Sequence, residues 1–406
     1  NLEATQDPGA YSLFAILSEG QTAEAGAAAL SAEIARMRDT PVTQAELDEA
    51  KNEIVTNTIE QRETAYGRAF ELADSVIRYG DAAYADRLLA TVQRVTPADV
   101  QRVARRILND QRRVLVRYLP QQQGVTGDTI TTASTIQAHT ISIPASEIPV
   151  FTLAPEGQRQ APPAAGTPID ARIPATAQRT LANGLRVIVA PNRALPLISA
   201  DLRVASGSSA DPHDRAGLAG MTADLLTRGT TTRSATDIAR QIESLGASIS
   251  SGAGVDSSAV SLMTRSDRVN DAFTVFADVA RNPAFAQEEL ERAQQQSLDG
   301  LQVALSQPGS IAQFAMTRAL YGDAPYGAVA SQRSISATTR DDMATYHRTY
   351  WRPDNAVLVI TGDVSADEGF ALAERYFGDW PHPSTPAPAR PDASAYAAAP
   401  RAIVVD

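Results

Sequence analysis

The sequence predicts a chain of repeated α/β units, and three observations support that fold class. Strand and helix patterns alternate over residues 1–120 and again beyond about residue 175. A stretch rich in Gln, Thr, Pro, Gly and Ala lies between these blocks and lacks sustained helical periodicity. A capped helix followed by a strand recurs about 240 residues apart, which indicates a repeat of domain size rather than a solenoid.

The first block carries clear helix-start signals. Thr43 and Glu46 form a Thr-x-x-Glu capping box. Thr96-Pro97 supplies an N-cap and a first-turn proline, and Asp99 places negative charge in the first turn. Helices are therefore predicted over 23–37, 43–63, 66–79 and 96–108, with strands at 10–17 and 113–117.

The second block opens with a hairpin signal. Asn183-Gly184 permits the positive φ angles of a tight turn, and it lies between the strand-like runs of 179–189. Further strands are predicted at 197–205, within 247–263 and at 356–360, and helices at 217–226, 234–245, 267–280, 287–305 and 310–321. The repeated unit matches Thr96, Asp99, Val100 and Val114 with Thr339, Asp342, Met343 and Val357.

Bulk properties exclude several classes of protein. The 406 residues carry a formal net charge of −11, which argues against a dominant nucleic-acid or anionic-membrane partner. No apolar run approaches the ~20 residues that span a bilayer. The absence of cysteine excludes disulfides and Cys-ligated metal sites. Because the chain starts at Asn1 without a signal-like segment, we expect a processed protein or an internal piece of a longer polypeptide.

Several collinear patterns resemble the insulinase/pitrilysin family of zinc peptidases. They are the hairpin Leu181–Val189, the strand end Val204–Asp211, Gly217-Leu-Ala219 followed by Gly229-Thr230, Pro325-Tyr-Gly327, Tyr350–Asn355, Val359–Asp363 and Phe377–Trp380. The resemblance is strong from about Thr176 to Trp380 and weaker before Leu119. It implies an α+β fold of repeated two-layer α/β domains, each a mainly antiparallel sheet packed on helices.

The resemblance also implies a domain organisation. Residues 1–119 are expected to be the C-terminal part of one peptidase-family domain, and 120–174 an interdomain linker. Residues 175–395 are expected to form an inactive peptidase-like domain without the zinc motif. Residues 396–406 are expected to begin a following domain.

The family's zinc motif, HxxEH, places two histidines one helical turn apart and a glutamate beside the metal-bound water. A further glutamate, roughly 70 to 80 residues later, completes a three-ligand site. Aligned through Gly217-Leu-Ala219, the corresponding positions here are Gly220, Ala223, Asp224 and approximately Leu298, with Asp299 the nearby acid. Since one carboxylate cannot replace three ligands, we expect no metal, no catalytic residue and no cofactor in this segment.

Other residues offer no substitute site. The four histidines, His139, His213, His347 and His382, are scattered through linker, loop, helix and turn. Packing is favoured over ligation for His347, and a solvated turn for His213. Ser206–Ser209 lacks the flanks of a nucleophile elbow, and the Gly-rich pieces lack the Lys and spacing of a phosphate-binding loop.

Two functions remain open. In the first, the segment is the non-catalytic half of a zinc metalloendopeptidase, enclosing the chamber and helping to bind peptides or unfolded proteins. The zinc and the active HxxEH would then lie in an upstream half of the same polypeptide. In the second, it is an inactive partner of a separate active subunit, or a structural core subunit without peptidase activity. The composition suits a periplasmic protein, with a cytoplasmic location as the alternative.

Overall fold

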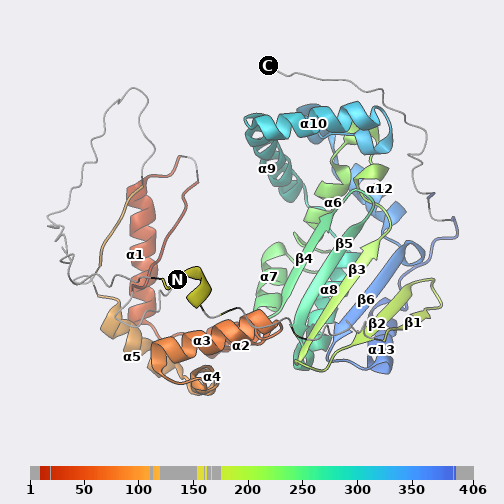
Figure 1. Ribbon diagram of the computed structural model, residues 1–406. Coiled ribbons are helices and arrows are strands. Elements are labelled where there is room, and N and C mark those ends of the chain that lie inside the picture. The colour runs from red at the N-terminus through yellow and green to blue at the C-terminus, as the bar shows by residue number, and fades with distance from the viewer. Residues whose placement is uncertain are drawn as a thin grey trace.

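The computed structural model describes residues 10–18, 20–109, 113–118, 153–159, 161, 166, 175–386 and 388–389. They form a helical part before the predicted linker and a sheet-containing part after it (Figure 1). Most of the predicted linker, all of 396–406 and His139 lie outside these residues. None of the described helices is long and apolar enough to cross a membrane.

The helical part confirms the predicted helix starts. Both capping boxes form, because Thr43 and Glu46, like Thr96 and Asp99, exchange side-chain and backbone hydrogen bonds. Leu47 and Ala104 are the buried apolar residues among the described positions before the predicted linker, so these helices have little core of their own. The helices are α1 (Ala23–Asp39), α2 (Gln44–Gln61), α3 (Ala65–Tyr79), α4 (Tyr84–Arg94) and α5 (Pro97–Ile107).

The two strands predicted in this part are wrong. Residues 10–18 contain only an isolated bridge at Tyr11, and residues 113–118 contain no strand. Their apolar side chains face solvent, as at Ile16 and Val116. An extended segment becomes a sheet strand only when a ladder of its backbone groups pairs with a neighbour, and among the described residues these two segments form no such ladder. The predicted repeat therefore keeps its capped helix, whereas its strand forms only in the second copy.

The second part is built on one six-stranded sheet. The strand order is β1-β2-β6-β3-β5-β4, and all neighbours are antiparallel except β2 and β6. The predicted hairpin forms between β1 and β2, with Gly184 at φ +93° in its turn. The strands are β1 (Ala177–Thr180), β2 (Arg186–Pro191), β3 (Leu197–Val204), β4 (Ser248–Ala253), β5 (Ser258–Arg265) and β6 (Ala356–Gly362).

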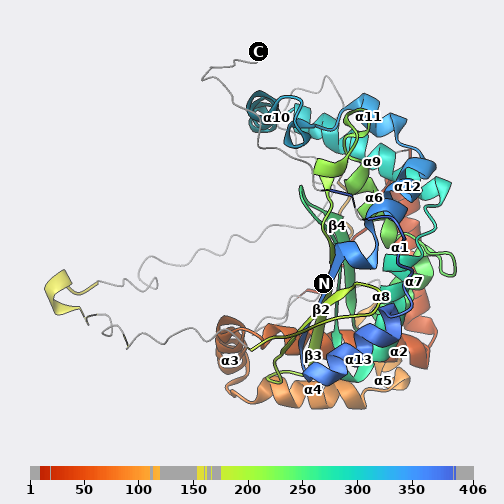
Figure 2. The same cartoon turned by 90° about the vertical axis from the view of Figure 1, so that its right-hand side faces the viewer.

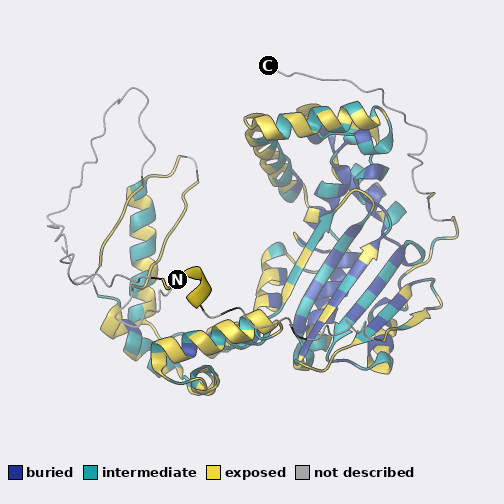
Figure 3. Cartoon of the chain, viewed as in Figure 1, coloured by how far each residue is buried: buried dark blue, intermediate teal, exposed yellow. Residues whose placement is uncertain are grey.

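Helices cover one face of this sheet (Figure 2). Alternate strand residues such as Leu202, Leu262 and Leu358 are fully or almost fully buried beneath them, and the residues between point to the other face (Figure 3). This confirms the α+β class with a mainly antiparallel sheet. The helices are α6 (Leu218–Leu226), α7 (Ala235–Ser244), α8 (Val269–Arg281), α9 (Gln287–Leu305), α10 (Pro308–Tyr321), α11 (Gln332–Ala337), α12 (Arg340–Tyr350) and α13 (Ala366–Phe377).

The two parts touch where α2 packs on α7. Asn52 donates its side-chain amide to the Ser244 carbonyl at 2.8 Å and accepts from Arg265 at 3.3 Å. Gly246, at φ +61°, lies so close that a Cβ there would be 2.7 Å from the Asn52 carbonyl oxygen. At this point the backbone of Gly246 therefore packs directly against the backbone of α2 at Asn52.

Candidate functional site

Helix α6 carries three of the four positions identified from the zinc motif. It starts after Gly217, whose φ of +102° suits a residue without a Cβ. The Asp211 carboxylate accepts hydrogen bonds from the backbone N–H groups of Gly217 at 2.8 Å and Ala219 at 2.9 Å. It thus satisfies donors that the first turn of a helix leaves unpaired. Burial raises the pKa of Asp211 to about 6, against the lowering effect of these bonds.

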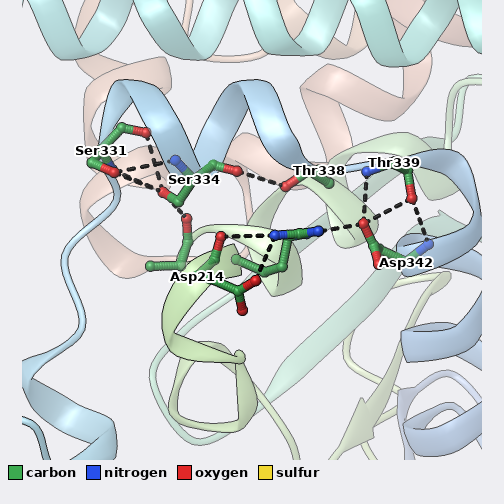
Figure 4. Close-up of polar contacts among 8 residues, drawn as sticks. Asp214, Ser331, Ser334, Thr338, Thr339 and Asp342 are labelled. Carbon is green, nitrogen blue, oxygen red and sulfur yellow. Dashed lines mark hydrogen bonds and ion pairs between the residues drawn. The ribbon is translucent and has the colours of Figure 1, made fainter.

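The loop before α6 is also fixed to α11 and α12 (Figure 4). Arg215 forms ion pairs with Asp342 at 3.1 Å and with Asp214 at 2.7 Å. Asp342 is at the same time the capping acid of α12. The buried Ser334 hydroxyl of α11 donates to the Ala216 carbonyl at 2.9 Å. These contacts hold the loop that leads into α6.

A pocket of about 370 Å³ lies between α6 and α9. Its α6 side is one face of the helix, with residues at the i, i+3, i+4 and i+7 spacing. These residues are Gly217, Gly220, Met221 and Asp224. The α9 side consists of Ser297, Gly300, Leu301 and Ala304, and Phe314, Val329, Ala330 and Ile335 complete the wall. Most of these side chains are apolar or small, and Asp224 is the charged one.

The structure thus brings two of the four predicted positions together in this pocket, Gly220 and Asp224. Ala223 is fully buried and is not part of the wall. Leu298 packs against the hydrophobic core, and its neighbour Asp299 is exposed and accepts a bond from Gln295. Gly300, two residues beyond Leu298, faces the pocket instead.

Asp224 has an unusual environment for a carboxylate. It is an exposed residue by surface area, yet desolvation raises the pKa of its carboxyl, against the effect of Arg228 one turn along. The described part of the chain shows no ion pair or hydrogen bond to its side chain. Asp224 therefore contributes a charge at the edge of a mostly apolar pocket.

The residues of this pocket do not fit zinc. A catalytic zinc site needs three N, O or S ligands, whereas the wall offers one carboxylate and the hydroxyl of Ser297. Across the described residues, no three His, Asp or Glu side chains are grouped as a metal site would require. No chemistry through a metal is therefore derived for this segment, and the loss of the zinc site remains a prediction.

His347 is a packing residue, as the sequence analysis favours. Its Nε2 lies 3.0 Å from the Ala280 carbonyl, so this nitrogen carries the proton, and its ring stacks on Trp351. Burial lowers the pKa of His347 to about 4. His213 lies exposed in a short 3-10 turn, and His382 approaches Asp354 at 3.6 Å. These three histidines lie on separate elements.

The uncovered face of the sheet holds polar residues that motif reasoning missed. Asp201 on β3 accepts from Arg203 at 3.1 Å and from Ser261 on β5 at 2.7 Å. Strand β4 ends the sheet, and its Ser248 and Ser250 are exposed. The signal was available in the sequence, since polar residues alternate with apolar ones along 199–203.

The second part is an α+β unit, and the predicted zinc-motif positions Gly220, Ala223 and Asp224 lie on its helix α6. Sequence comparison agrees with this class. The family model Insulinase (Peptidase family M16) matches residues 186–331, and Peptidase M16 inactive domain matches 337–405. The chain belongs to the M16 insulinase/pitrilysin family.

Curated relatives and solved structures each match about half of the chain. An uncharacterized zinc protease of Mycobacterium leprae is 28% identical over 210 residues, covering 51% of this chain and 47% of the relative. The crystal structure of a peptidase M16 inactive domain from Pseudomonas fluorescens is 30% identical, with a TM-score of 0.51 over 54% of this chain and 53% of the other.

A protease from Helicobacter pylori, 20% identical with a TM-score of 0.51, covers 54% of each chain and shares the fold. The chain spans about half the length of the curated relatives it matches.

Proposed function

We propose that this chain is the non-catalytic half of an M16 zinc metallopeptidase, which helps to enclose the substrate chamber and to bind extended peptides. The observation that carries the proposal is helix α6. Its flanking residues Gly217-Leu-Ala219 resemble those of the family's zinc helix, and on that alignment Gly220, Ala223 and Asp224 stand where HxxEH would lie. In this proposal the zinc belongs to another half that keeps the motif, in the same polypeptide or in a partner subunit.

The uncovered sheet face supports the binding role. Asp201, Arg203 and Ser261 offer a charged and hydrogen-bonding surface, and the edge strand β4 offers backbone groups to an extended peptide. The chain's net charge of −11 favours basic peptides over acidic ones. The domain boundaries at 119, 174 and 395 and a periplasmic location belong to the same proposal.

The first test measures zinc content, peptide hydrolysis and peptide binding on the purified chain. We expect no stoichiometric zinc after equilibration and removal of free metal, no cleavage of an unfolded basic peptide, and saturable binding of that peptide by fluorescence anisotropy. One tightly bound zinc per chain, or cleavage that a chelator abolishes, would falsify the proposal.

A matched pair of variants tests the surface. Asp201→Asn removes a charge from the uncovered face, whereas Asp367→Asn removes one from exposed helix α13 on the other side of the sheet. Asp201→Asn should weaken binding of the basic peptide severalfold, and Asp367→Asn should leave it nearly unchanged. If the chain binds no peptide at all, the alternative of a structural core subunit is favoured.

A further inference from the structure

The pocket between α6 and α9 remains open although small residues face each other across it. A Cβ built on Gly220 or on Gly300 would meet no heavy atom within 4 Å. Small residues on facing helices commonly let the backbones approach closely, whereas here they leave a space that opens to solvent. Here the loop before α6 is fixed by Asp211, Arg215 and Ser334, so the helices do not close the space.

The wall of the pocket specifies the chemistry of a ligand. Met221, Leu301 and Phe314 supply apolar surface, which favours a compact apolar group. Asp224 supplies negative charge at the solvent-facing side, and among the described residues Arg228, whose charge acts on it, forms no ion pair with it. A carboxylate in this position gains most from a cation that arrives with the apolar group.

We infer that the α6–α9 pocket binds an apolar primary amine, with its ammonium on Asp224 and its apolar body among Met221, Leu301 and Phe314. An N-terminal residue with an apolar side chain and a free single-residue amine share this chemistry. The inference does not rest on the proposed function, because it concerns binding by this chain alone.

The test uses the whole chain and two probes, L-phenylalaninamide, which carries an ammonium, and N-acetyl-L-phenylalaninamide, in which an acetyl group replaces that charge by a neutral amide. NMR-monitored or calorimetric titration should give a roughly millimolar Kd for the amine, typical of a small ligand. The acetylated probe should bind at least about tenfold more weakly, since it lacks the ammonium. Equal binding of the two probes would overturn the assignment of Asp224.

Variants locate the site. Asp224→Asn should weaken the amine about tenfold, whereas Asp299→Asn, an equal charge change outside the pocket wall, should not. Gly300→Leu should abolish binding by filling the pocket, and its Cβ enters open space, so the fold should tolerate it. If Gly300→Leu does not fold, Gly220→Leu fills the same pocket from the other helix and takes its place in the test. Retained binding in a folded filling variant places the amine elsewhere and refutes the inference.

The two sources of the ligand are then separated by size. A tetrapeptide that begins with phenylalanine should bind at least as tightly as the single-residue amine if peptide N-termini are the natural ligand. If the tetrapeptide binds about tenfold more weakly than the single-residue amine, the pocket binds free amines rather than peptide N-termini. If neither binds, the inference fails.

Discussion

The buried His347 makes the stability of the sheet unit depend on pH in a calculable way. Its ring donates to the Ala280 carbonyl and stacks on Trp351, and burial lowers its pKa from 6.5 to about 4. Between these values the unfolded chain binds a proton that the folded chain does not. This contribution to stability is complete above pH 6.5 and is lost as the pH falls toward 4. The difference between the two pKa values corresponds to a loss of about 3 kcal/mol in the free energy of unfolding.

The chain provides its own reporter for this measurement. Its two tryptophans, Trp351 and Trp380, are both buried in the sheet unit, so their fluorescence follows unfolding of that unit rather than of α1–α5. Urea unfolding at several pH values between 7 and 4 then gives the free energy of unfolding at each. Carboxylates elsewhere also titrate in this range, so the result is read as a difference between variants.

The comparison uses His347→Gln, which has no titrating ring, and His213→Gln, which changes an exposed histidine. His347→Gln should be less stable than the wild type at pH 7, because it loses ring packing, but its stability should fall by about 3 kcal/mol less on going to pH 4. His213→Gln should follow the wild type. If His347→Gln and the wild type lose stability in parallel, His347 is not the buried neutral group described here.

Three further predictions concern the pocket and the helical part. The triple variant Gly220→His, Asp224→His and Gly300→Glu should bind one zinc per chain by metal analysis, because the glycine positions have room for side chains; a folded variant that binds none would show that α6 and α9 are not spaced for a metal. Gly246→Ala should speed hydrogen exchange in α2, since its Cβ would meet the Asn52 carbonyl; unchanged exchange would contradict a close contact. Limited proteolysis should cut α1–α5 before the sheet unit, because those helices bury few apolar side chains; the reverse order would count against this.

Local signals mark several of the elements that sequence analysis predicted. Thr43, Thr96 and Ser234 mark helix starts by short-range hydrogen bonds, and Asn183-Gly184 marks a turn. Helices α4, α11 and α13 escaped prediction, although α11 and α13 begin with capping boxes of the same kind. In α4 the residue at the N-cap is Ala83, which has no side-chain oxygen to cap the first turn.

The predicted strands at 10–17 and 113–117 failed for a different reason. Their sequences suit an extended backbone, but a strand also needs a partner that lies far away in the sequence. Nothing in the local pattern tells whether such a partner is present. The hairpin of β1 and β2 was predictable because its partner lies only a turn away.

Of the positions predicted from the motif, Gly220 and Asp224 on α6 line the pocket, whereas Leu298 on α9 does not. The flanking residues of the motif fix the alignment closely on α6. Across the loop and helix that follow, an error of two residues rotates a position by about 200° around the helix. That error separates Leu298, which packs in the core, from Gly300, which faces the pocket.

The close approach at Gly246 has a mechanical consequence. A side chain at a contact absorbs a small shift by changing rotamer, whereas two backbones without space between them move together. Gly246 lies between the end of α7 and the start of β4 at Ser248, so a displacement of α2 is passed directly to the edge of the sheet. A displacement of the helical part would therefore reach β4, the edge strand to which the proposed function assigns peptide binding.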